Sequence, residues 1–159
     1  MITNTFGLQN FYKVSDMMRE AFNNSEYVNT VTYGNIFTID LSKQTIFPLA
    51  HIQVNSATHS ENVITYNISI MNLDIVDISK DDTIDVYYGN DNLHYVYNTQ
   101  LAVINEFVQL VKRGSISRDG FQLNGDATSE AVEDSYENLL AGWVTTLNID
   151  VANNISVCD

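Results

Sequence analysis

The residues best suited to chemistry are five aspartates gathered between positions 74 and 85. They are Asp74, Asp77, Asp81, Asp82 and Asp85. Carboxylate oxygens that converge on one point bind hard divalent cations. Their spacing does not follow the calcium-loop pattern D-x-[DN]-x-[DN]-G-x5-E, and neither does the sequence around Asn124-Gly125-Asp126. A solvated turn explains Asp81 and Asp82 more simply, so we expect no metal and no cofactor.

Histidine and cysteine residues are few in this chain. His51, His59 and His94 show no H-x-x-x-H or H-x-H spacing, which argues against a zinc site. The single cysteine, Cys158, can form neither an intramolecular disulfide nor a thiolate metal cluster. No G-x-S-x-G elbow and no glycine-rich phosphate loop occurs. Spacing alone does not exclude a Ser–His–Asp triad, which is assembled in space, but the sequence predicts a protein that is not an enzyme.

Composition and charge narrow the class of protein. We expect one domain over residues 1–159, because this length suits a single core and the 45% hydrophobic content argues against disorder. The formal net charge of -13 argues against a duplex DNA reader and against binding to an anionic membrane. No apolar run is long enough to span a membrane, and no secretory signal opens the chain. We therefore expect synthesis in a reducing cytoplasm.

The sequence predicts two amphipathic helices. Residues 8–24 carry apolar side chains at helical spacing, and residues 98–113 carry a stripe of the same kind. Lys112 and Arg113 suit the negative end of the second helix, and Gly114 follows in the place of a left-handed cap.

Alternating hydrophobic residues predict the strands. A hairpin is expected where residues 28–33 meet residues 37–41 across Gly34-Asn35, and a second hairpin where residues 50–54 meet residues 63–73 across a polar loop at 55–62. Shorter or later strands are expected at residues 121–123 and 143–151. This order predicts a single-domain α+β fold, with a largely antiparallel sheet and both helices packed on one face.

The aromatic residues have two interpretations. Trp143, the only tryptophan, alternates with the buried face of its strand, which favours a core position over an interface. Four tyrosines lie close together in the sequence and fit either an edge strand or a surface that binds another protein. They are Tyr87, Tyr88, Tyr95 and Tyr97.

Taken in order, these elements resemble the tail-terminator and neck (head-to-tail connector) proteins of tailed bacteriophages. The resemblance begins with the N-terminal helix and its following strands and spans residues 6–151. It rests on four further stretches, which are residues 46–52, 68–77, 101–113 and the Leu140-Ala141-Gly142-Trp143 entry to the last strand.

The resemblance implies a structural virion protein located in the neck or tail of a phage. Such proteins form homo-oligomeric rings, six-fold or twelve-fold, that contact neighbouring neck and tail proteins and let DNA pass without specific binding. Within a ring, the acidic segment before the last strand would face a neighbour or the lumen. Its residues are Glu130, Glu133, Asp134, Tyr136 and Glu137. The last residues, about eight, would form a tail. The alternatives are a small soluble metal-dependent enzyme and a non-viral adaptor or binding module.

Overall fold

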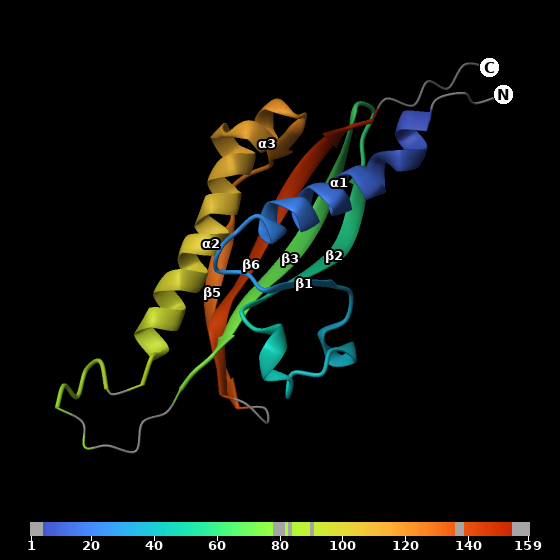
Figure 1. Ribbon diagram of the computed structural model, residues 1–159. Helices are drawn as coiled ribbons and strands as arrows, with labels where there is room; N and C mark the ends of the chain where they lie inside the picture. The colour runs from blue at the N-terminus through green and yellow to red at the C-terminus, as the bar shows by residue number, and fades with distance from the viewer. Residues whose placement is uncertain (1–4, 78–81, 83, 90, 136–138, 154–159) are drawn as a thin grey trace, which may run out of the picture.

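Two long helices cover one face of a six-stranded sheet, which confirms the α+β fold (Figure 1). The computed structural model describes residues 5–77, 82, 84–89, 91–135 and 139–153. The helices are α1 (Thr5–Asn23), α2 (Leu93–Arg113) and the single turn α3 (Ser115–Arg118). The strands are β1 (Thr30–Tyr33), β2 (Leu49–His59), β3 (Val63–Ile75), β4 (Phe121–Leu123), β5 (Thr128–Ser135) and β6 (Leu139–Ala152). Their order is β1-β2-β3-β6-β4, with β5 also paired to β6.

The centre of the sheet is the antiparallel pair β3 and β6. Ile68 lies opposite Leu147 and Ile64 lies opposite Val151, so the hydrophobic residues of both strands point to the helices. The predicted pairing of β2 with β3 is also present, with Ile52 opposite Ile70. Each fully buried aliphatic side chain of this kind contributes about 1.5–3 kcal/mol.

Helix α1 lies on the sheet along part of the predicted apolar stripe, whereas Phe11 and Tyr12, which also fitted that stripe, are exposed. Val14, Met18 and Phe22 recur every four residues and are buried. Phe22 meets Phe107 of α2 with ring centroids 4.8 Å apart, which joins the two helices. Nearer the start of α1, the Asn10 side-chain amide donates to the Ala152 carbonyl over 3.0 Å.

The hairpin predicted after residue 33 is wrong. β1 pairs in parallel with β2, and Ile36–Thr38 form one 3-10 turn, η1, that Asn35 caps by accepting a hydrogen bond from the Phe37 amide. A second such turn, η2 (Gln44–Ile46), follows, and this crossover packs on the sheet face opposite the helices. The alternation in residues 37–41 misleads because Leu41 packs on a small cluster of Phe47, Leu49, Leu73 and Leu140, while Phe37 points to solvent.

Three further features differ from what the sequence predicts: the end of β2, the start of α2 and the conformation of Gly114. β2 continues through the expected loop to His59, past a bulge between Val54 and Ser56. α2 begins at Leu93 instead of residue 98, because its first turns pack on a small cluster that includes Val96. Gly114 has a φ of -109°, so it is not a left-handed cap.

Three buried polar side chains lie between two hydrophobic clusters beneath α2. Asn72 of β3, Thr145 of β6 and Gln100 of α2 are all buried. On one side of them lies the main hydrophobic cluster, and on the other a small cluster of Val76, Val96 and Ala141. No hydrogen-bond partner for the Asn72 and Gln100 amides occurs among the described residues. A buried polar group without a partner costs about 1–3 kcal/mol.

Candidate interaction surfaces

The aspartates between positions 74 and 85 have different structural roles and environments. Asp74 lies on β3, where its carboxylate accepts a hydrogen bond from the Ile75 amide over 2.8 Å. Burial raises its pKa above the ordinary value, and the nearby Asp77 charge raises it further. Asp85 organises a turn, Asp82 is exposed, and Asp81 lies outside the described residues. Among the described residues, no three acidic, histidine or cysteine side chains are grouped as a metal site requires.

His51 is held as a neutral structural residue. It is 1% exposed on β2, and its Nε2 lies 2.6 Å from the carbonyl oxygen of Gly34. A carbonyl can only accept, so Nε2 carries the proton and Nδ1 accepts from the Thr32 hydroxyl at 2.8 Å. Burial lowers the pKa of His51, against the opposing effect of the hydrogen bond to Gly34. The imidazole therefore joins β1 and the crossover to β2.

We expect acid to destabilise the fold through His51. Its folded-state pKa lies below the unfolded value near 6.5, so the unfolded chain binds more protons between the two values. The stability that the neutral ring provides is complete above about pH 6.5 and is lost as the pH falls toward the folded pKa, by at most about 1.4 kcal/mol per pH unit. Urea denaturation between about pH 5 and about pH 8 measures this slope. His51→Gln removes the titrating ring and should flatten the slope, and an unchanged slope would contradict this assignment.

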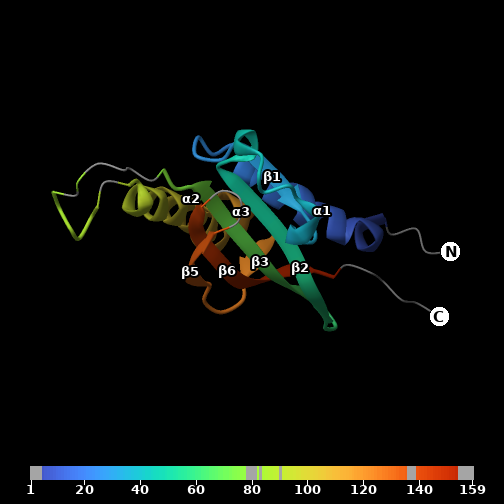
Figure 2. The same cartoon turned by 90° about the horizontal axis from the view of Figure 1, so that it is seen from below.

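A short arm, residues 84–89, projects from the molecule between β3 and α2 (Figures 1 and 2). The Asp85 carboxylate accepts from the amides of Tyr87 and Tyr88, and the Gly89 amide donates to the Asp85 carbonyl over 2.7 Å. Gly89 has a φ of +70°, a left-handed conformation that closes this turn. The turn is thus fixed by hydrogen bonds to the Asp85 carboxylate and carbonyl and by the conformation of Gly89.

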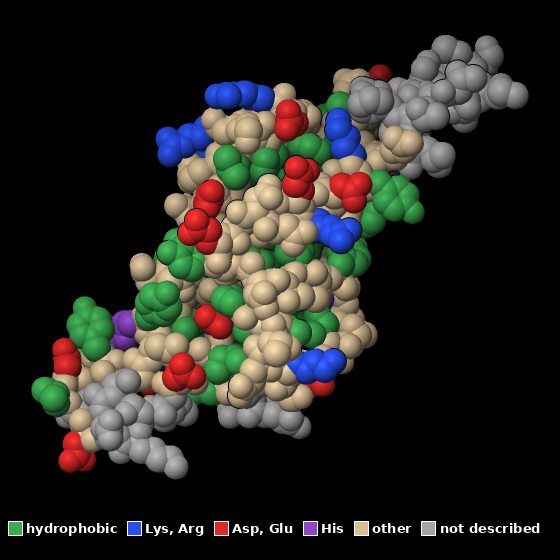
Figure 3. All heavy atoms as spheres, viewed as in Figure 1, with side chains coloured by type: hydrophobic (Ala, Val, Ile, Leu, Met, Phe, Trp, Pro, Cys, Tyr) green, Lys and Arg blue, Asp and Glu red, His purple; other side chains and the backbone are tan. Residues whose placement is uncertain are grey.

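The arm exposes apolar side chains. Ile84 is 97% exposed and Val86 is 90% exposed. The rings of Tyr87 and Tyr88 contact each other and His94 in the first turn of α2, in edge-to-face or tilted arrangements with centroids 4.9–5.4 Å apart. Hydrophobic side chains accordingly gather at the lower left of the space-filling view (Figure 3). An ordered turn that presents apolar residues outward is typical of a protein contact site.

The base of the arm is closed by Asn92. Its side-chain oxygen accepts from the Asp77 amide over 2.7 Å, which joins the end of β3 to the start of α2. The tyrosines expected on an edge strand are therefore wrongly placed, because Tyr87 and Tyr88 lie in a turn and Tyr95 and Tyr97 lie in α2. Their other interpretation, contact with a protein, stays a prediction.

Exposed aromatic residues also occur at the β1 edge of the sheet, away from the arm (Figure 1). We use the name β1 patch for Phe11, Tyr33 and Phe37, which are exposed aromatic residues of α1, of β1 and of the turn η1 that follows β1. Phe11 and Tyr33 meet edge to face with centroids 6.3 Å apart, and both remain exposed. Phe37, in η1, is 85% exposed. Sequence reasoning missed this patch because Phe37 fitted a buried alternation.

The acidic segment before the last strand is itself a strand. β5 pairs antiparallel with β6, with Glu130 opposite Val144 and the Asp134 backbone opposite Leu140. Glu130 and Glu133 are exposed. Tyr136 and Glu137, the other two residues expected at an interface or lumen, lie outside the described residues.

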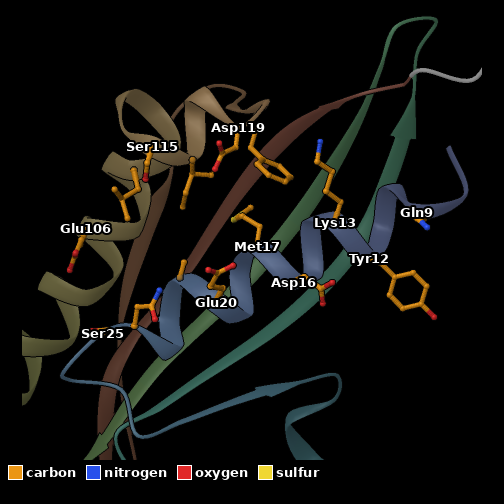
Figure 4. Close-up of a pocket in the computed structure, with 15 residues that line it drawn as sticks. Gln9, Tyr12, Lys13, Asp16, Met17, Glu20, Ser25, Glu106, Ser115 and Asp119 are labelled. Carbon is orange, nitrogen blue, oxygen red and sulfur yellow. The ribbon is translucent and has the colours of Figure 1, made fainter. Parts of the chain in front are cut away.

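A groove separates α1 from α2 and α3 on the helical face (Figure 4). It has a volume of about 1120 Å³ and is lined by Met17, Leu110 and Phe121, among others. No sequence pattern predicts this groove. It arises from the angle between two helices, and neither helix has a sequence feature that would indicate that angle.

Comparison with known proteins identifies no family for this chain, so its function is argued from its own residues. No protein-family model matches the chain, and a search of curated protein sequences finds no significant match. Within the residues that the structure describes, no helix combines the length and apolar character needed to cross a membrane.

Proposed function

We propose that the chain is a structural subunit that assembles with copies of itself into a closed ring. The observation that carries this proposal is the presence of two different exposed apolar surfaces, the arm and the β1 patch, at separate places on one subunit. Two different surfaces that bind each other generate head-to-tail contacts, and such contacts close into a ring when the rotation between subunits allows it.

The chemistry of the two surfaces supports mutual binding. Both are rich in aromatic residues, which supply much of the contact energy at protein interfaces. Tyr87 and Tyr88 of the arm are exposed, as are Phe37 and Tyr33 of the β1 patch. The arm is also ordered before contact by the Asp85 hydrogen bonds, which reduces the entropy lost on binding.

We further propose that this ring belongs to the neck or tail of a tailed phage, as the resemblance of residues 6–151 to that family implies. The net charge of -13 supports this role, because a strongly acidic subunit repels the DNA phosphates and lets DNA pass without being gripped. The virion location is part of this proposal.

The assembly of purified protein tests the ring. Light scattering after size-exclusion chromatography, together with negative-stain microscopy, should show closed rings of the wild-type chain. Tyr87→Ser with Tyr88→Ser should abolish the rings while the monomer keeps its fold by circular dichroism, because both side chains are exposed. Tyr27→Ser, an exposed tyrosine outside both surfaces, should leave the rings intact.

Mixing two variants distinguishes a head-to-tail ring from a symmetric pair. The Tyr87→Ser, Tyr88→Ser variant keeps its β1 patch, and a Phe37→Ser variant keeps its arm, so each retains one good surface. We expect each variant to be monomeric alone and the mixture to form dimers. A wild-type chain that stays monomeric at the highest concentration it tolerates, or an arm variant that still forms rings, would overturn the proposal.

A further inference from the structure

The groove between the helices is open because α1 and α2 touch at one end and then diverge. Phe22 and Phe107 make the contact, with ring centroids 4.8 Å apart. Beyond it, α1 crosses the sheet in a different direction from α2, and α3 and β4 form the far wall (Figures 1 and 4). The groove is therefore a built feature of the helical layer, placed away from the arm.

The floor of this groove is apolar. Met17 and Ala21 of α1 and Leu110 of α2 are partly exposed there, and all three pack on the main hydrophobic cluster. Ile116 and Phe121 close the floor at the far wall. A partly exposed apolar floor gains free energy when a partner covers it.

The rim is acidic. Asp16 and Glu20 line it from α1, Glu106 lines it from α2, and Asp119 lies beyond α3. None of these four carboxylates makes an ion pair within the described part of the chain. The one cation in the lining is Lys13, whose Nζ lies 5.5 Å from the centre of the Phe121 ring. A ligand bound here meets several negative charges around an apolar centre.

We propose that this groove binds an amphipathic helix of a different protein, with apolar side chains on one face and Lys or Arg along its flanks. A helix suits the site because its walls are helices, and a third helix could pack between them at the usual distance. Basic flanks complement the carboxylates of Glu20 and Glu106 on the two walls. The arm of a second copy is a poor occupant, because it carries Asp85 close to its apolar tip.

A designed peptide tests this site directly. The probe is a fluorescent amphipathic helix of Leu, Ala and Lys, with leucine on one face and lysine on the flanks, and its control is a scrambled peptide of the same composition. Fluorescence anisotropy should show saturable binding of the probe and much weaker binding of the scrambled peptide. Equal binding of the two peptides, or no binding, would overturn the proposal.

Matched variants separate the groove from general attraction to an acidic protein. Glu20→Gln with Glu106→Gln removes two rim charges and should weaken binding by about tenfold. Glu61→Gln with Glu130→Gln removes the same charge elsewhere on the exposed surface and should change binding by less than about twofold. Equal effects of the two pairs would contradict the groove.

The peptide site does not depend on the proposed ring. The arm variant Tyr87→Ser with Tyr88→Ser leaves every groove residue intact, so it should bind the probe with wild-type affinity. Rings without probe binding would reject the groove alone, and probe binding without rings would reject the ring alone.

Discussion

Replacing Gly142 with alanine is expected to destabilise the fold by about 3 kcal/mol or more. A Cβ at this position would lie 1.8 Å from the carbonyl oxygen of Asn72 and 3.0 Å from the Cα of Leu73. Both are backbone atoms of β3, which is held between β2 and β6. The two strands would have to separate at the centre of the sheet, so the loss is large for one methyl group.

Gly125→Ala is the matched control for this prediction. Gly125 has a φ of +76° and no atom within 4 Å of an added Cβ, so alanine there meets backbone strain but no clash. That strain costs about 1–2 kcal/mol. Urea denaturation followed by circular dichroism measures both variants. If Gly142→Ala cost no more than Gly125→Ala, the close approach of β6 to β3 would be wrong.

Replacing Trp143 with alanine is expected to cost about 3 kcal/mol, at the low end for tryptophan because part of its surface is exposed. Its Nε1 donates to the Tyr97 carbonyl over 2.9 Å, and the two rings meet edge to face at 5.6 Å. Trp143→Phe keeps an aromatic ring but loses the hydrogen bond, so it should cost about 1 kcal/mol.

The Trp143 variants also distinguish a structural residue from an interface residue. Through its hydrogen bond to the Tyr97 carbonyl, the side chain joins β6 to the first turns of α2. Hydrogen exchange at the start of α2 should therefore accelerate in Trp143→Ala more than exchange in α1. A variant that keeps its unfolding free energy but no longer forms rings would instead assign Trp143 to the interface.

The elements that could be predicted from the sequence are those whose local pattern matches their burial. Val14, Met18 and Phe22 mark one helical face, and the alternation in β3 and β6 marks one sheet face. Both follow from burial against a single layer. The partner of a strand cannot be predicted in this way, because no local pattern in β1 indicates its parallel pairing with β2.

The surfaces were harder to predict than the core. β5 carries Glu130 and Glu133 and has no hydrophobic alternation, so only its hydrogen bonds to β6 make it a strand. Phe37 had the pattern of a buried residue and is exposed. The groove depends on the angle between α1 and α2, which is set by packing at Phe22 and Phe107 and by no short motif.

The central position of β6 has a consequence for synthesis on the ribosome. β6 pairs with β3 on one side and with β4 and β5 on the other, yet it is made after all the other strands that the structure describes. Until residue 152 has left the exit tunnel, the thirteen residues of β3 keep one edge open to other nascent chains. We infer that this chain folds after translation of β6, and that chains arrested before residue 139 need chaperones to stay unaggregated.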